Sequence, residues 1–82
     1  MASKKIIDQV WDKGTPVRGK NPEVWRKDPE GNPIRKPSYG TVGQFGWEID
    51  HKNPKAGGGS DNLRNLQPLQ WEANREKSDK KK

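Results

Sequence analysis

The chain has 82 residues, of which 26% are hydrophobic and 34% are charged, and its mean hydropathy is -1.39. So short a chain can build one hydrophobic core, and the absence of Cys with a single His excludes disulfides, thiolate zinc sites and multi-His metal sites. Seventeen Lys and Arg against eleven Asp and Glu give a net charge of +6, which favours polyanionic partners, nucleic acid first and anionic membranes second. No apolar run approaches the ~20 residues that span a bilayer, and no signal-peptide pattern is present, so we expect a soluble, cytoplasmic protein.

The first segment with a clear pattern is residues 1–13, which predict a short amphipathic helix. Ser3 is a good N-cap, and Gly14 stands where helices commonly end. Between them, apolar residues recur at helical spacing. Ile and Val also favour extended structure, so a strand is the alternative.

The middle of the chain is rich in glycine and proline, which predicts turns and a loose hairpin. Its two arms are residues 23–27 and 34–36, with the sequence Asp-Pro-Glu-Gly-Asn-Pro between them. This hairpin would present Arg26 and Arg35 either to nucleic acid or simply to solvent.

The aromatic residues are the main candidates for the core. The chain has four Trp, one Tyr and one Phe, which is more aromatic character than its low hydrophobic content suggests. We expect the core to include Trp25, Tyr39, Trp47 and Trp71. With no Cys in the chain, neither a disulfide nor a thiolate zinc site can stabilise the domain, so its stability must come from the four Trp.

The last third of the chain has the clearest order of elements. Residues 47–51 predict a short strand, and residues 52–62 predict a loop with three consecutive glycines. Residues 63–69 predict a second strand, in which Pro68 requires an edge or an end. Residues 70–79 predict a helix. We therefore expect a single domain over residues 1–79, followed by a disordered basic tail at 80–82.

Asp50 and His51 are adjacent at the end of the predicted strand and together supply what phosphodiester hydrolysis requires. Aspartate is a hard oxygen ligand suited to Mg²⁺ or Mn²⁺. An imidazole titrates near neutral pH and can take a proton from water. In a regular strand, however, Asp50 shares a face with Glu48, and His51 points to the other face. Both can serve one site only if the strand ends or bulges there.

A longer ordered string surrounds these two residues. It reads Glu48-x-Asp50-His51-x-x-Pro54, then Gly57-Gly58-Gly59-Ser60-Asp61-Asn62, then Asn65-Leu66-x-x-Leu69, then Asn74. This string resembles the HNH nuclease superfamily, and its intervals are similar to those of the HNH domain of RNA-guided CRISPR nucleases. The chain resembles small stand-alone bacterial and phage HNH proteins more closely. The residues that carry this resemblance are Val10-Trp11, Trp25 to Asp28, Tyr39-Gly40 and Gly46 to His51.

The resemblance implies an α+β fold with a small ββα-metal core over residues 46–79, extended by the N-terminal helix and the loop-rich hairpin. It implies Asp50 and Asn74 as metal ligands, His51 as the general base and Asn65 as the brace of the loop. Glu48 would either orient a ligand or a metal-bound water, or be a strand residue paired with a lysine. The residues predicted to contact nucleic acid are Arg75, Lys77, Lys52, Arg26 and Arg35.

The expected function is that of a metal-dependent endonuclease that hydrolyses DNA, nicking one strand with low sequence specificity. The expected cofactor is one divalent ion, Mg²⁺ or Mn²⁺ before Zn²⁺ or Ni²⁺, with no structural zinc on Cys. DNA is the expected partner, with no membrane and with a second copy or a larger recognition, packaging or restriction partner as additional candidates. The alternatives are a non-catalytic nucleic-acid-binding module on the same fold and a nuclease toxin domain.

Overall fold

The structure is a computed structural model that describes residues 3–79. Over this range the chain forms two helices and two antiparallel sheets, which confirms the predicted α+β class. Neither helix in residues 3–79 is long and apolar enough to cross a membrane. The predicted tail at 80–82 lies outside the described residues. In chain order the elements are α1 (Lys4–Trp11), β1 (Thr15–Pro16), β2 (Trp25–Lys27), β3 (Pro33–Arg35), β4 (Trp47–His51), β5 (Leu66–Gln70) and α2 (Trp71–Asp79).

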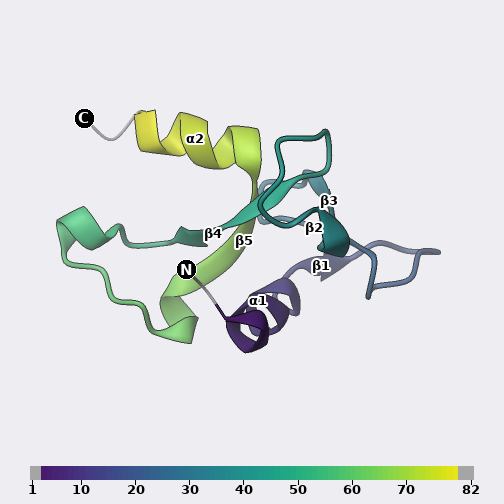
Figure 1. The fold of residues 1–82 in the computed structure, drawn as a ribbon, viewed down its shortest axis with the longest axis horizontal. Helices are drawn as coiled ribbons and strands as arrows, with labels where there is room; N and C mark the ends of the chain where they lie inside the picture. The colour runs from purple at the N-terminus through teal and green to yellow at the C-terminus, as the bar shows by residue number, and fades with distance from the viewer. Residues whose placement is uncertain (1–2, 80–82) are drawn as a thin grey trace.

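The C-terminal half consists of β4, β5 and α2. The two strands pair antiparallel, from Trp47 opposite Gln70 to His51 opposite Leu66, and α2 follows β5 directly and lies beside this sheet (Figure 1). Pro68 lies within β5, and it is tolerated because β5 has a hydrogen-bonded neighbour on one side only. The expectation that Pro68 requires an edge is confirmed.

Two boundaries in this half differ from the predicted ones. The second strand begins at Leu66 rather than at residue 63, because Leu63–Asn65 form a turn of 3₁₀ helix. The C-terminal helix begins at Trp71, because Gln70 acts as its cap: Gln70 Oε1 accepts a hydrogen bond from Ala73 N at 3.0 Å. Glutamine is not a typical capping residue, so the sequence gives no signal for this boundary.

The N-terminal helix is confirmed, together with its cap. Ser3 Oγ accepts a hydrogen bond from Ile6 N at 3.3 Å, and α1 ends at Trp11, shortly before Gly14. Lys13, just beyond the helix, donates hydrogen bonds to the carbonyl oxygens of Leu63 and Leu66. These bonds attach the end of α1 to the start of β5.

The predicted hairpin is confirmed as β2 and β3, and β1 adds a third strand beside β2. The sequence did not predict β1, because a strand of two residues has no recognisable period. Asp28 holds the turn of the hairpin and is only 2% exposed. Its carboxylate accepts hydrogen bonds from Glu30 N, from the backbone and side chain of Asn32, and from Gln70 N. Asp28 thereby attaches the hairpin to the start of α2.

The core is centred on Trp11 and Trp47, which are fully buried with ring centroids 5.4 Å apart. Ile34 from the hairpin and Leu66 from β5 complete it, so both halves of the chain contribute. Tyr39 packs edge-on against Trp47 at 5.0 Å. This core fixes the start of β4, four residues before the predicted base.

Trp25 and Trp71 lie at the margin of the core, which corrects the expectation that both are core residues. Trp25 packs against Phe45 at 4.9 Å and carries the Arg35 guanidinium over its ring at 5.2 Å. Trp71 donates its indole N–H to the carbonyl oxygen of Gly43 at 2.8 Å. Each indole thus keeps an edge or face for a polar partner, which a tryptophan offers and an aliphatic side chain does not.

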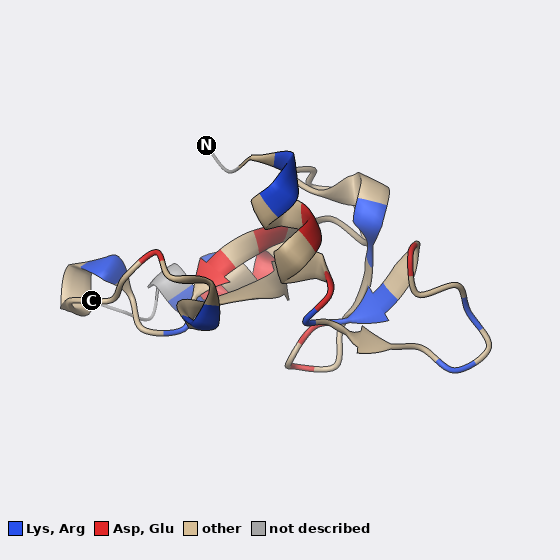
Figure 2. Ribbon diagram, turned by 90° about the horizontal axis from the view of Figure 1, so that it is seen from below, with Lys and Arg blue, Asp and Glu red and all other residues tan. Residues whose placement is uncertain are grey.

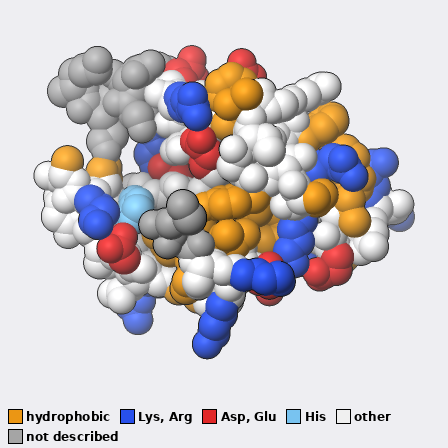
Figure 3. Space-filling view, in the orientation of Figure 1, with side chains coloured by type: hydrophobic (Ala, Val, Ile, Leu, Met, Phe, Trp, Pro, Cys, Tyr) orange, Lys and Arg blue, Asp and Glu red, His pale blue; other side chains and the backbone are white. Residues whose placement is uncertain are grey.

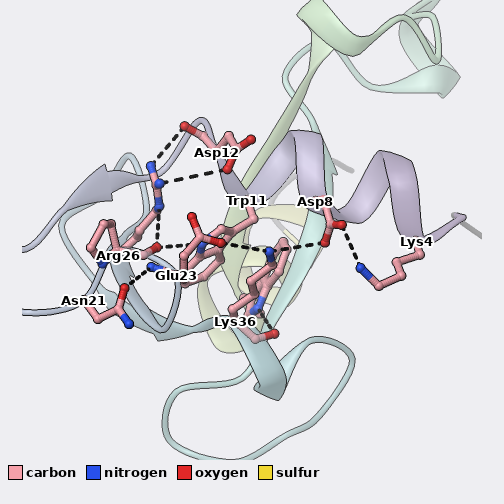
Figure 4. Close-up of polar contacts among 10 residues, drawn as sticks. Lys4, Asp8, Trp11, Asp12, Asn21, Glu23, Arg26 and Lys36 are labelled. Carbon is pink, nitrogen blue, oxygen red and sulfur yellow. Dashed lines mark hydrogen bonds and ion pairs between the residues drawn. The ribbon is translucent and has the colours of Figure 1, made fainter.

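Polar contacts join α1 to the hairpin (Figure 4). The Lys36 ammonium lies 3.3 Å from Asp8 Oδ1 and 3.4 Å from Glu23 Oε1. The Arg26 side chain is only 11% exposed and donates to backbone carbonyl oxygens. These oxygens belong to Asp12, Gly14 and Pro22. Arg26 therefore stabilises the N-terminal half.

Candidate active site

The predicted base, both predicted metal ligands and Glu48 lie where β4 ends beside α2. Because side chains alternate along a strand, Glu48 and Asp50 both face α2, where they meet Asn74 and Lys77. His51 is the last residue of β4. In a regular strand the side chains of Asp50 and His51 would point to opposite faces of the sheet. Because β4 ends at His51, both side chains can line the same hollow.

This hollow has a volume of about 260 Å³ and lies between β4, the start of the following loop and α2. Asp50, His51 and Asn74 all line it, together with the two lysines Lys55 and Lys77. The structure thus brings together the predicted base and both predicted metal ligands.

A larger open cleft of about 840 Å³ continues from His51 and Asn74 toward α1. Its apolar lining comes from Ile6, Ile49 and Leu66. Figure 3 shows the histidine (pale blue) at the surface beside a basic and an acidic side chain, with apolar side chains (orange) in the middle of the same face. A polar hollow beside an apolar cleft is suited to a ligand that combines charged and apolar parts.

Asp50 is the buried acidic group of this site, with 8% of its side chain exposed. Its Oδ2 accepts hydrogen bonds from Lys77 Nζ at 2.6 Å and from Gln67 Nε2 at 2.8 Å. The same ammonium also donates to the carbonyl oxygen of His51 at 3.1 Å. A buried carboxylate is costly without a compensating charge, and Lys77 supplies that charge.

Glu48 fixes the orientation of Asn74. The amide nitrogen of Asn74 donates to Glu48 Oε1 at 2.7 Å, and Arg75 donates to Glu48 Oε2 at 3.2 Å. Because a carboxylate accepts hydrogen bonds, the amide presents its nitrogen to Glu48 and keeps its oxygen for another partner. Glu48 was expected either to orient a ligand or a metal-bound water, or to pair with a lysine. In the structure it contacts Asn74, one of the predicted ligands, and forms an ion pair with Arg75.

Asn65 holds the loop that follows β4. Its side chain accepts a hydrogen bond from Asn53 N at 2.9 Å and donates to the carbonyl oxygens of Asn53 at 3.0 Å and Ser60 at 2.7 Å. Its backbone oxygen accepts from Lys52 N at 2.8 Å. A single asparagine thus connects both ends of the glycine loop, which is the arrangement that a loop brace requires.

Asp61 is a neighbour of His51 that sequence reasoning missed. Its Oδ1 lies 2.7 Å from His51 Nε2, and its Oδ2 accepts a hydrogen bond from Lys55 at 3.2 Å. The hydrogen bond with His51, and then the contact with Lys55, hold the pKa of the Asp61 carboxyl below its ordinary value of 3.8. Asp61 follows the glycine run, and the sequence alone gave no sign that the loop returns to the end of β4.

The basic residues predicted to contact nucleic acid have different surroundings. Lys and Arg occur along the whole molecule, and Asp and Glu occur among them, with several of the acidic residues near its centre (Figure 2). Lys52 is exposed, and Arg75 is exposed although it pairs with Glu48 and lies over the Trp71 ring at 5.3 Å. Lys77 is paired with Asp50, Arg26 is occupied by backbone carbonyls, and Arg35 lies on Trp25.

The donor set at the hollow fits a hard divalent cation. Asp50 and Asn74 offer oxygen ligands, and no described residue donates a hydrogen bond to Oδ1 of either side chain. Within residues 3–79 no three His, Cys, Asp or Glu side chains gather as a metal site. An ion here would therefore rely on two protein oxygens and on water or phosphate, and Lys77 would be its competitor on Asp50.

No protein family, curated protein or solved structure matches this chain.

Proposed function

We propose that the chain is a metal-dependent DNA endonuclease of the HNH type, with β4, β5 and α2 as its ββα-metal core. The observation that carries this proposal is the meeting of Asp50, His51 and Asn74 around one small hollow. The loop brace provided by Asn65 supports it further. The order strand, loop, strand, helix and the residue at each position agree with the resemblance found in the sequence.

In this proposal each residue of the chain has a separate task. His51 accepts the proton of the water that attacks phosphorus. Asp50 and Asn74 would hold a divalent ion, which would supply positive charge to offset the negative charge of the phosphate and of the departing 3′ oxygen. Glu48 keeps the amide of Asn74 turned so that its oxygen is available. Asn65 maintains the loop beside the base.

DNA would be bound chiefly through exposed cations near the hollow. Arg75, which is 58% exposed, and Lys52 are the candidates whose surroundings leave them accessible to phosphate. Arg26 is committed to three carbonyl oxygens, so we leave it out of the proposed DNA surface. With one site in each chain, a single visit cuts one strand.

The test is a supercoiled-plasmid assay with Mg²⁺, Mn²⁺ or EDTA, run on the unmodified protein and on His51→Ala. We expect nicked circles with metal and none with EDTA, and a rate at least ~100-fold lower for His51→Ala. Glu30→Ala is the matched control, because Glu30 is exposed in the hairpin turn and does not line the hollow. Equal cleavage by the protein and His51→Ala would contradict the proposal and indicate a contaminating nuclease.

The non-catalytic binding module remains the second candidate because of one observation. Lys77 already neutralises Asp50, so the buried carboxylate has a counter-ion without any metal. This candidate predicts DNA binding that is unchanged by EDTA and by His51→Ala, with no nicking in any metal. Fluorescence anisotropy with a labelled duplex, run beside the plasmid assay, separates the two functions.

A further inference from the structure

The contact between His51 and Asp61 determines which nitrogen of the imidazole carries the proton. His51 Nε2 lies 2.7 Å from Asp61 Oδ1. An ionised carboxylate can only accept hydrogen bonds, so Nε2 must donate to it. In the neutral ring, Nδ1 then holds the lone pair, and Nδ1 is the atom available to take a proton.

Three features of the loop deliver Asp61 to this position. Asn65 binds the carbonyl oxygens of Asn53 and Ser60, which closes the loop directly before Asp61. Gly59 N donates to the carbonyl oxygen of Pro54 at 2.8 Å, so the two arms of the loop lie against each other. Lys55 pairs with the second oxygen of Asp61 at 3.2 Å and leaves the first for the imidazole.

We propose that Asp61 is a positioning residue that fixes the tautomer and the ring orientation of His51 through the Nε2 contact. The structural part of this inference concerns the metal-free protein, and its catalytic consequence rests on the proposed nuclease function. Asp61 touches no reacting atom in this scheme. It acts only through His51, whose ring borders both the small hollow and the larger cleft.

The experiment is ¹⁵N NMR of the imidazole in metal-free protein at about pH 8.5, roughly 2 units above the ordinary imidazole pKa. We expect one dominant tautomer with a detectable Nε2–H proton shifted downfield by the carboxylate. In Asp61→Ala this proton should be lost to solvent exchange. In Asp61→Asn the amide can donate to Nε2, so the Nδ1–H tautomer should gain population, as the corresponding change does in Ser-His-Asp triads.

Two controls make the result specific. Glu30→Ala removes an exposed acid far from the imidazole and should leave its signals unchanged. Asp61→Glu keeps a carboxylate and should restore the Nε2–H signal at least in part. Imidazole signals that are identical in the unmodified protein, Asp61→Ala and Asp61→Asn would overturn the inference.

Nicking assays on the same variants separate this inference from the proposed function. We expect Asp61→Ala to lower the nicking rate on the order of 10-fold, less than the ~10² to 10⁴ that a general base contributes. If the Asp61 variants change the tautomer of His51 but the unmodified protein does not nick DNA, the positioning role of Asp61 is supported and the proposed nuclease function is refuted. Nicking that depends on His51 and metal but is unaffected by Asp61→Ala would overturn the positioning role alone.

Discussion

At the scale of single residues, Asp50 and Lys77 form the least exposed ion pair of the candidate site. The carboxylate side chain is 8% exposed and the ammonium-bearing side chain 30% exposed, with 2.6 Å between the paired atoms. Exposed pairs such as Lys4–Asp8 are screened by water and contribute little to stability, whereas a buried carboxylate depends on its partner. In the proposed nuclease, Lys77 and the metal compete for one carboxylate.

Lys77→Met should therefore tighten metal binding while it destabilises the metal-free protein. Removing the neighbouring positive charge should lower the dissociation constant for Mn²⁺ about 10-fold, since each 1.4 kcal/mol is one decade. The unpaired carboxylate should cost roughly 1–3 kcal/mol of unfolding free energy, below the ~3–5 of fully buried pairs because Lys77 is partly exposed. Calorimetric titration and urea denaturation measure the two effects.

Lys27→Met is the control for loss of a surface charge, since Lys27 is exposed on β2. It should change neither quantity appreciably. Equal Mn²⁺ affinity in Lys77→Met and in the unmodified protein would contradict competition on Asp50. No binding by any of the three would contradict the metal site itself.

At the scale of elements, the loop between β4 and β5 decides whether the site can form. Its three glycines are not equivalent. Gly58 has a φ of 90°, a backbone conformation that residues with a side chain rarely adopt. At Gly59 an added Cβ would lie 1.7 Å from the carbonyl oxygen of Asn53, so only glycine fits there. At Gly57 the nearest atom to an added Cβ is Asn53 Oδ1 at 3.7 Å, an ordinary contact.

Gly59→Ala should consequently open the loop, whereas Gly57→Ala should leave it closed. We expect Gly59→Ala to lose the contact between Asp61 and His51 and to become sensitive to protease within the loop. Nicking by Gly59→Ala should fall at least ~10-fold, because His51, the proposed base, loses its contact with Asp61. Limited proteolysis and the plasmid assay, run on both variants, measure these effects. Similar protease resistance in the two variants would show that the close approach at Gly59 is not required.

At the scale of the whole molecule, ion pairs between α1 and the hairpin make stability depend on pH. The hydrogen bond from Lys4, and then the contacts with Lys36, hold the pKa of Asp8 below its ordinary value of 3.8, although partial burial opposes them. Burial lowers the pKa of Lys36, but Asp8 and Glu23 outweigh burial and raise it above its ordinary value of 10.5. Both shifts mean that the folded state favours the charged forms.

Stability should decline on both sides of the neutral range. A lowered carboxyl pKa contributes stability above 3.8 that is lost as the pH falls through the folded value. A raised ammonium pKa contributes stability below 10.5 that is lost as the pH rises through its folded value. Asp8→Asn should flatten the acid side of the curve, and urea midpoints measured from about pH 2 to about pH 12 test this. An acid limb as steep in Asp8→Asn as in the unmodified protein would assign the loss to other carboxylates.

The sequence predicted the elements whose signals are local. Ser3 gave the N-cap of α1, the turn of the hairpin followed from its prolines and glycine, and Pro68 marked an edge strand. It did not predict the cap formed by Gln70 or the burial of Asp28, because both depend on partners supplied by chain folding. Trp71 was expected in the core for its size, yet its position at the margin depends on a carbonyl of the loop before β4.

The sequence by itself determined the α+β class and the spacing of Asp50, His51, Asn65 and Asn74, because periodicity and residue chemistry are properties of the order of residues. Only the tertiary structure decided which side chains contact the predicted site residues. Lys77 lies on Asp50 because α2 packs across β4, and Asp61 lies on His51 because Asn65 and Gly59 close the loop. Such contacts join residues far apart along the chain, and no local pattern encodes them, since each depends on how several elements pack at once.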